Sequence, residues 1–300
     1  MDLKTWAKKY PLTTNAKTIT DSDHETVKPF FHWVGGKREL ISRYPNIFPQ
    51  KYNTYFEPFL GGGAVFYHLQ PEHAVLSDIN PDMIKTYNAV KNNVDGVIEV
   101  LKDLKARHSE EFYYAVRGID RDPDWVNATD TDVAARFLFL NRTGFNGLYR
   151  INKSGFNNVP IGSSLNKTIF SENELRNASK FLQKHEFSTQ SFTEIAALVK
   201  KGDFVYLDPP YAPLTPTANF TSYAKEGFGW AEQKQVADLC REIDNKGGLF
   251  LASNSDTPDL RALYEGFNIY SVNISRRMNS KGDKRGDVGE VLISNYEVEL

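Results

Sequence analysis

The stretch YFEPFLGGGAVFYHL, residues 55–69, decides the expected fold of this chain. It begins as a short strand and ends as an apolar run with helical spacing, and the glycines Gly61, Gly62 and Gly63 lie between the two. Glycines at such a turn let a ligand approach the backbone closely, and the first turn of the helix offers N–H groups that lack a partner within the helix. A strand, a glycine turn and a helix in this order predict the start of an α/β sheet with a ligand site.

Further short runs rich in β-branched and aromatic residues predict more strands. Most are almost continuously apolar, which is typical of central strands covered on both faces. Helical patterns separate several of them, so we expect an α/β sheet. One helix starts clearly at Asn80-Pro81-Asp82, because a capping side chain is followed by proline in the first turn. The predicted strands are NTYFE (53–57), HAVLSDI (73–79), DFVYLD (203–208), GGLFLASN (247–254), FNIYSVNI (267–274) and GEVLISNY (289–296).

The middle of the chain interrupts this alternation. Its pattern is mainly helical, and it closes with YRINKSGFNNVPIG (149–162), which predicts a β-hairpin that turns at residues 152–155. We interpret it as an inserted domain. The predicted divisions are a polar N-terminal extension (1–27) with room for a short helix near Trp6, an α/β domain in two parts (28–81 and 171–300), and the inserted domain between them (82–170).

The charge is unevenly distributed. The net charge of −2 argues against a generically basic nucleic-acid binder, but no Asp or Glu occurs between Val133 and Ser171. A second basic stretch, SRRMNSKGDKRGD (275–287), is rich in glycine. Positive charge is therefore expected at two places, which suits contacts with an anionic partner. The cations of the acid-free stretch are Arg136, Arg142, Arg150, Lys153 and Lys167.

Several classes of protein are disfavoured. The single cysteine, Cys240, fits a helical apolar stripe, so we expect a core residue in a cytoplasmic protein. The six histidines show no metal-ligand spacing. No apolar run approaches the roughly 20 residues of a membrane span, and the N-terminus has no apolar signal core.

The stretch FVYLDPPYAPL (204–214) carries the clearest chemistry. Prolines cannot donate to a sheet, so the strand must stop after Leu207, and the chain leaves in a stiff, extended direction. What remains is rich in acceptors: the Asp208 carboxylate and the Pro209 carbonyl, with Pro210 and Tyr211 beside them. Such a site suits a planar group with two N–H donors, for example the exocyclic amine of a nucleobase. The alternative is a proline-terminated strand with a solvated carboxylate.

Three other segments predict a nucleotide or nucleoside ligand. Asp78 ends a strand, where its carboxylate could accept hydrogen bonds from ribose hydroxyls. In FFHWVGGKREL (30–40), Trp33 offers a stacking surface, Gly35 and Gly36 allow an irregular loop, and Lys37 could neutralise a carboxylate; a surface turn is the alternative. Phe192 could cover a bound adenine or belong to the core. Neither the dinucleotide fingerprint nor a phosphate-cradling P-loop is present.

Together these segments resemble the Dam-type DNA adenine methyltransferases of the D12 class, in which the recognition domain lies between the glycine-rich motif and DPPY. The resemblance runs from about Lys28 to Tyr296 and rests on the order of six modest motifs. They are HWVGGK, FEPFLGGG, LSDIN, LNRTGFNGLYRIN, FNNVPIG and DPPYAPLTPTANFTSY.

The resemblance implies a Rossmann-like catalytic domain (28–81 and 171–300) with an inserted, mainly helical DNA-recognition domain (82–170). It also implies S-adenosylmethionine as cofactor and methyl transfer to the exocyclic amine of an adenine flipped out of duplex DNA, in a GATC target. Asp208, Pro209, Pro210 and Tyr211 would be catalytic, with Tyr211 stacked on the base. Many relatives have lysine where this chain has His32, which leaves the outer guanine contact open. The implied cofactor residues are Trp33, Gly35, Gly36, Lys37, Glu57, Pro58, Phe59, Gly61, Gly62, Gly63, Asp78, Ile79, Phe192 and Asp208. The implied DNA-binding residues are His32, Arg142, Phe145, Asn146, Leu148, Arg150, Asn158 and Pro160.

The alternatives are an amino-methyltransferase that acts on another adenine site, on cytosine or on RNA, a DNA-binding protein without turnover, and a nicotinamide-dependent oxidoreductase. Asp208 favours adenine, since enzymes of the cytosine-amino group usually have serine there. We expect double-stranded DNA as partner and neither a metal nor a membrane. The protein would be a monomer or weak dimer on DNA in the cytoplasm of a bacterial or phage-infected cell, with a cognate restriction endonuclease as an open candidate partner.

Overall fold

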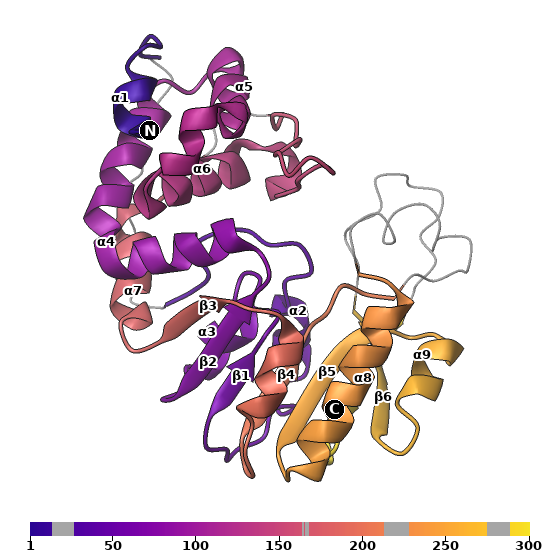
Figure 1. Ribbon diagram of the computed structural model, residues 1–300. Helices are drawn as coiled ribbons and strands as arrows, with labels where there is room; N and C mark the ends of the chain where they lie inside the picture. Colours follow the sequence, from indigo (N-terminus) through magenta and orange to yellow (C-terminus); the bar gives the residue numbers. More distant parts are fainter. Residues whose placement is uncertain (14–26, 164, 166–167, 213–227, 275–288) are drawn as a thin grey trace. The chain divides into compact units, whose positions relative to one another are not determined.

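The computed structural model describes residues 1–13, 27–163, 165, 168–212, 228–274 and 289–300 (Figure 1). These residues form two compact units. The first unit holds residues 1–36, 61–68 and 80–189, and the second holds residues 37–60, 69–79 and 190–300. The basic stretch 275–287, Lys167 and the residues that follow DPPYA up to Gly227 lie outside the described part.

The second unit is built on a mostly parallel sheet with the strand order β2-β1-β4-β5-β7-β6. β1 is parallel to β2 and β4, and β4 is parallel to β5, whereas β7 runs antiparallel to both β5 and β6. All six predicted strands are confirmed, and the sheet belongs to the expected α/β class. The strands are β1 (Tyr55–Glu57), β2 (Ala74–Asp78), β4 (Phe204–Leu207), β5 (Leu249–Ser255), β6 (Asn268–Val272) and β7 (Glu290–Ser294).

Burial explains why these segments become strands. Every residue of β1, β4 and β7 is buried, as their continuous apolar patterns require. The register sets Tyr55 beside both Ala74 and Phe204, so β1 is the central strand between β2 and β4.

One face of this sheet is covered by α8 and η4, which pack with β4, β5 and β7 into one apolar core. Cys240, on α8, is fully buried in that core, so the prediction of a core cysteine is confirmed. No helix of the described residues is long and apolar enough to cross a membrane. The helices of this unit are α2 (Arg38–Arg43), η4 (Phe192–Ala197), α8 (Trp230–Asn245) and α9 (Pro258–Leu263).

The first unit is mainly helical. Its longest helix, α4, begins as predicted: the side chain of Asn80 accepts hydrogen bonds from the N–H groups of Asp82 and Met83. α4 is kinked at Asn93, whose side chain accepts from the N–H of Gly96 and so caps the second half of the helix. The elements are α1 (Leu3–Ala7), α3 (Ala64–Leu69), α4 (Pro81–Ala106), α5 (Glu110–Gly118), η1 (Ile119–Arg121), η2 (Pro123–Asn127), α6 (Asp130–Thr143), η3 (Phe145–Gly147), α7 (Glu172–Leu182) and β3 (Glu186–Thr189).

The first thirteen residues are part of this unit's packing. Leu3 is fully buried, and its N–H donates to the Asp132 carboxylate on α6 at 3.0 Å. Trp6 and Tyr10 contact the ring of Phe112, with centroids 6.1 and 5.1 Å away. The short helix near Trp6 therefore contributes an apolar face to the helical packing of the first unit.

The segment after α6 folds back on itself in antiparallel bridges between Gly144 and Ile161 and between Ile151 and Asn157. The N–H of Gly155 donates to the carbonyl of Asn152, which closes the turn at the predicted residues. The hairpin is held by isolated bridges rather than by a continuous ladder. We call residues 144–161 the recognition hairpin, after the role that the family resemblance predicts for them.

Candidate functional site

The strand order places a topological switch point in the second unit. The chain leaves β1 toward β2 on one side, and β4 lies on the other side of β1. In parallel sheets, ligands bind outside the carboxyl ends of strands at such a point. Pro58 and Phe59 follow β1, and Asp208 follows β4, so the predicted ligand residues of this unit lie where the fold favours a site.

Asp208 is held at the end of β4 by two donors. The ammonium of Lys37 lies 2.8 Å from its Oδ1, and the hydroxyl of Ser253 donates to the same oxygen at 3.0 Å. Burial opposes the charge on Lys37, but the oxygens of Asp208, Tyr206 and Glu290 outweigh it and raise the pKa of Lys37 above its ordinary value. Lys37 therefore pairs with a carboxylate of the protein itself, Asp208; its contact with a cofactor stays a prediction.

Tyr211 belongs to the same cluster. Its hydroxyl accepts a hydrogen bond from Lys37 Nζ at 2.8 Å and donates to Glu290 Oε1 at 2.5 Å. Burial and the nearby carboxylates raise the pKa of Tyr211 well above its usual range, so this hydroxyl stays protonated. Stacking of its ring on a base stays a prediction.

A set of buried polar side chains that the sequence reading missed supports the Asp-Pro-Pro-Tyr turn. Gln233 on α8 donates to the Pro210 carbonyl at 2.7 Å. Asn254 accepts from the N–H of Ala212 at 3.0 Å, and Ser255 donates to the Ala212 carbonyl at 2.9 Å. The prolines alone do not fix this turn; the end of β5 and α8 hold it from behind.

Glu290 was also missed. It lies at the start of β7 and is 4% exposed. Its position within a predicted strand suggested no chemistry, because the residues that surround it come from distant parts of the chain. The one signal available was a carboxylate in a run that is otherwise continuously apolar.

Aromatic rings lie near the end of β1. Phe59 stacks on Phe192 with centroids 5.0 Å apart and an interplanar angle of 28°, and Phe228 lies 5.9 Å from each. Phe192 is 9% exposed and belongs to the core of the second unit; that its ring also covers a bound adenine stays a prediction. Phe59 is partly buried and is the more accessible ring.

The remaining predicted residues of the second unit lie at the ends of β1 and β2. Glu57 is buried and accepts the hydroxyl of Tyr55 at 2.7 Å. Asp78 is partly buried at the end of β2, and its carbonyl accepts the N–H of Gln190. Ile79 is 73% exposed.

In the first unit, Trp33 lies directly against the glycine turn. A Cβ at Gly61 would stand 2.6 Å from Cδ1 of Trp33, and one at Gly62 would stand 3.1 Å from its Cβ. Gly61 and Gly63 also have φ angles of +49° and +67°, which favour glycine. The glycines are therefore required by this local packing as well as by any ligand. Gly35, with a φ of +81°, and Gly36 follow Trp33 in an exposed turn.

His32 contacts the recognition hairpin. The side-chain amide of Asn141 bonds to both backbone groups of His32, at 3.0 and 2.7 Å, and to the carbonyl of Gly147 at 2.9 Å. The His32 ring lies where a Cβ at Gly147 would approach it to 3.0 Å. His32, predicted from a distant motif, therefore lies beside the other predicted DNA-binding residues.

Most of the predicted DNA-binding residues lie on the recognition hairpin, and Arg142 lies on α6 just before it. Phe145 is 43% exposed, and Asn146, Arg150 and Pro160 are also exposed. Arg150 donates through Nε to the side chain of Asn158 at 2.7 Å. Leu148 and Asn158 are partly buried, as is Arg142, which lies 3.9 Å from Glu174.

One cation of the acid-free stretch does not lie on a surface. Arg136 is 3% exposed and pairs with Asp120 at 2.7 Å. Arg136 is paired even though its own stretch of sequence contains no acid, because its partner, Asp120, comes from η1. Among the described residues, no group of three or more His, Cys, Asp or Glu is arranged to hold a metal ion.

Comparison with known proteins agrees with these features. A family model for D12 class N6 adenine-specific DNA methyltransferases matches residues 33–278. The type II methyltransferase M.MjaIII of Methanocaldococcus jannaschii is 41% identical over 90% of this chain and 99% of its own length. The type II methyltransferase M1.LlaDCHI of Lactococcus lactis is 38% identical over 90% of this chain and 96% of its own.

A DNA adenine methylase of Haemophilus influenzae is 39% identical over 88% of this chain and 92% of its own length. The match extends over both units and favours a methyltransferase over a nicotinamide-dependent enzyme and adenine over cytosine. The chain belongs to the D12 class of N6 adenine-specific DNA methyltransferases.

Proposed function

We propose that this enzyme methylates the N6 amine of adenine in GATC within duplex DNA and takes the methyl group from S-adenosylmethionine. The observation that carries the proposal is the carboxylate of Asp208 at the end of β4, with Oδ1 bound to Lys37 and Ser253. With Oδ1 held in this way, Oδ2 would accept one N–H of the amine. The similarity to DNA adenine methylases supports GATC as the target.

The amine of adenine is a poor nucleophile, because its lone pair is delocalised into the ring. Hydrogen bonds from its two hydrogens to Asp208 and to the Pro209 carbonyl would favour a tetrahedral nitrogen with an available lone pair. The buried supports of the turn keep both acceptors in place before the base arrives, so most of the acceleration comes from positioning and electrostatics.

Lys37 and Glu290 set the charge around these acceptors. The ammonium lies 2.8 Å from Asp208 and 3.8 Å from Glu290, so one cation faces two carboxylates. We assign to Lys37 the role of orienting Asp208, and to Tyr211 the role of covering the flipped base while its hydroxyl is anchored by Glu290.

The residues at the strand ends fit S-adenosylmethionine by their chemistry. The Asp78 carboxylate suits the two ribose hydroxyls, and the rings of Phe59 and Phe192 suit the adenine. When bound, this cofactor would supply an electrophilic methyl group on its sulfonium. Trp33 and the glycines of residues 35–36 and 61–63 are assigned to the same ligand on the strength of the family resemblance.

The recognition hairpin would read the DNA. A base in a duplex cannot reach a pocket at a strand end, so the target adenine must be flipped out. We assign Phe145 to fill the vacated stack, Asn146 to contact the orphan base and Arg150 to contact a guanine. His32, Arg142, Leu148, Asn158 and Pro160 complete the proposed contact surface.

We also propose that the enzyme acts in the cytoplasm, where it meets double-stranded DNA. Two relatives carry type II methyltransferase names, which favours a cognate restriction endonuclease as a partner in the cell.

The test is label transfer from radioactive S-adenosylmethionine to two duplexes that differ only in one tetranucleotide, GATC or GTAC. The proposal expects label in the GATC duplex and background in the other. Absence of label from both duplexes would refute methyl transfer to DNA. Equal label in the two would refute GATC specificity while leaving methyl transfer intact.

A further inference from the structure

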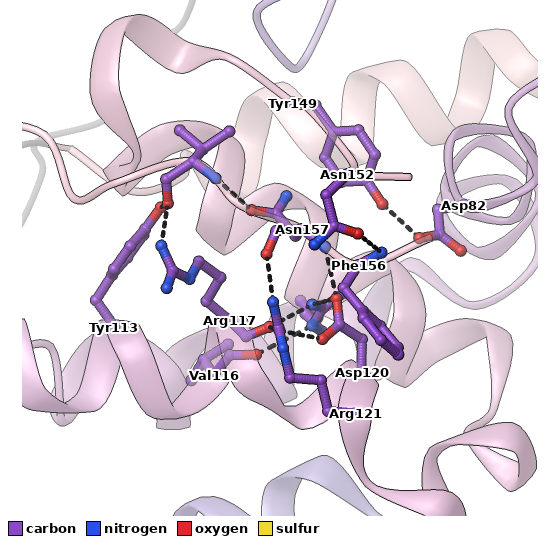
Figure 2. A network of polar contacts seen from close by, with 12 residues as sticks. Asp82, Tyr113, Val116, Arg117, Asp120, Arg121, Tyr149, Asn152, Phe156 and Asn157 are labelled. Carbon is purple, nitrogen blue, oxygen red and sulfur yellow. Dashed lines mark hydrogen bonds and ion pairs between the residues drawn. The ribbon is translucent and has the colours of Figure 1, made fainter. Parts of the chain in front are cut away.

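The second arm of the recognition hairpin is held by side chains from α5 and η1 (Figure 2). Arg117 Nη1 donates to the carbonyl of Val159 at 3.0 Å. The hydroxyl of Tyr113 lies within hydrogen-bond distance of the carbonyls of Val159 and Pro160, at 2.9 and 3.2 Å. These bonds reach the hairpin backbone, so they constrain its shape whatever side chains it carries.

Asp120 is the centre of this support. Its Oδ2 accepts the N–H of Asn157 at 2.8 Å and Nη2 of Arg136 at 2.7 Å, and its Oδ1 accepts Nη1 of Arg121 at 2.6 Å. Arg121 then donates through Nη2 to the carbonyl of Asn157 at 3.1 Å. Both backbone groups of Asn157 are thereby fixed by one carboxylate and its guanidinium partner.

The side chains that hold Asp120 are firmly placed. Arg136 also donates through Nε to the Val116 carbonyl at 3.0 Å and lies 5.4 Å from the ring of Trp125. A largely buried carboxylate that accepts from two guanidinium groups and a backbone N–H has both oxygens occupied, and removing its charge leaves the cations poorly compensated.

The residue after Asn157 links this support to the predicted readers. Asn158 accepts from Nε of Arg150 at 2.7 Å through its side chain, and its N–H donates to the Arg150 carbonyl at 3.1 Å. A shift of the Asn157 backbone would therefore move Asn158 and release the guanidinium of Arg150 from its orientation.

We propose that Asp120 is a positioning residue for target-sequence discrimination: it fixes Asn157, so that Asn158 presents Arg150 in one orientation to the DNA. Asp120 itself is not a contact to the bases. The inference rests on the proposed function, in that Arg150 reads the target.

The experiment compares wild type, Asp120→Asn and the control Asp124→Asn, which makes the same change at an exposed aspartate of η2. For each, rates of methyl transfer are measured on GATC and on duplexes that differ from it at one base pair, together with the affinity for S-adenosylmethionine. Asp120→Asn should lower discrimination by about tenfold, the value of one well-oriented base contact, with cofactor affinity unchanged. The control should match wild type.

Discrimination equal to wild type in Asp120→Asn would overturn the proposal. The proposal would also be overturned if Asp120→Asn lost methyl transfer to all duplexes in proportion to its loss of cofactor binding, since that pattern indicates general unfolding. In the double variant Asp120→Asn with Asn158→Ala, discrimination should fall no further than in the poorer single variant. Two effects that simply multiply would show that Asp120 does not act through Asn158.

Amide hydrogen exchange separates this inference from the proposed function. Even if wild type transfers no methyl group, the N–H of Asn157 should exchange slowly in wild type and much faster in Asp120→Asn. Equal exchange in the two proteins would contradict the positioning role independently of any activity.

Discussion

Asp208 in the second unit and Asp120 in the first are both carboxylates beside cations, yet their surroundings differ. Asp120 accepts hydrogen bonds through both oxygens, from two arginines and a backbone N–H. Asp208 meets Lys37 and Ser253 through Oδ1 alone, and its side chain is 22% exposed compared with 11% for Asp120.

The difference separates two uses of the same chemistry. A carboxylate whose oxygens are both occupied by the protein can hold a shape but has little capacity left for a ligand. A carboxylate anchored through one oxygen keeps a directed acceptor. We therefore infer that Asp120 stabilises the shape of the recognition hairpin, and that Asp208 takes part in the reaction.

The largest expected effect comes from removing the anchored acceptor. Asp208→Ala should lower the rate of methyl transfer by about a hundred- to a thousandfold, the usual effect of losing one preorganised polar group at a reacting centre. DNA binding should remain close to wild type, because the recognition hairpin is unchanged. Single-turnover rates and a DNA-binding titration measure the two quantities.

The matched control is Asp259→Ala, an exposed carboxylate on α9 of the same unit. It should retain the wild-type rate. Substantial transfer by Asp208→Ala would remove the distinction between the two aspartates.

A smaller effect, on discrimination between target sequences, is expected from replacing Arg150, the residue that Asp120 is proposed to position. Arg150→Ala should cost about 1–3 kcal/mol of discrimination at one base pair. Lys153→Ala, at the exposed turn of the same hairpin, should weaken binding to all duplexes alike and reduce its salt dependence, since a lysine there suits a phosphate. Rates on single-substitution duplexes separate the two variants. An unchanged sequence preference in Arg150→Ala would contradict the assigned contact.

The smallest expected effect concerns the stability of the protein and a buried histidine, His108. His108 is 6% exposed, and neither ring nitrogen has a hydrogen-bond partner among the residues that the structure describes. Burial lowers its pKa below the ordinary value of 6.5. The unfolded chain therefore binds the proton more readily than the folded protein does. Stability should be fully present above about pH 6.5 and should decline as the pH falls below that value.

Urea unfolding at pH 7.5 and pH 5.5 measures this decline. His108→Phe should show a smaller loss on acidification than wild type, and the exposed control His73→Gln should behave as wild type does. A wild-type protein that gains stability on acidification to pH 5.5 would be at odds with the uncompensated burial of His108.

Local pattern predicted much of the architecture. Continuous apolar runs indicated the buried strands, and Asn80-Pro81 indicated the start of α4, because each depends on neighbours in the sequence. Asn152 and Gly155 marked the hairpin turn for the same reason. These features require only that nearby residues agree with one secondary structure.

Pairings between distant residues could not be predicted in the same way. Apolar spacing shows that a segment is buried, but it does not show that Lys37 meets Asp208 or that Glu290 meets Tyr211. The acid-free stretch suggested exposed cations, whereas Arg136 is buried against an aspartate from outside that stretch. Ser253 and Asn254 were predicted only as part of a strand. Their side chains bond to Asp208 and to Ala212, which follow the neighbouring strand β4.

Identification of the methylated nucleoside tests whether the enzyme methylates the N6 amine of adenine and whether Asp208 is needed for the reaction. A GATC duplex is incubated with the enzyme and S-adenosylmethionine, digested to nucleosides and analysed by mass spectrometry. We expect N6-methyladenine in the product of wild type and almost none in that of Asp208→Ala. A methylated cytosine, or equal amounts of N6-methyladenine from both proteins, would contradict that expectation.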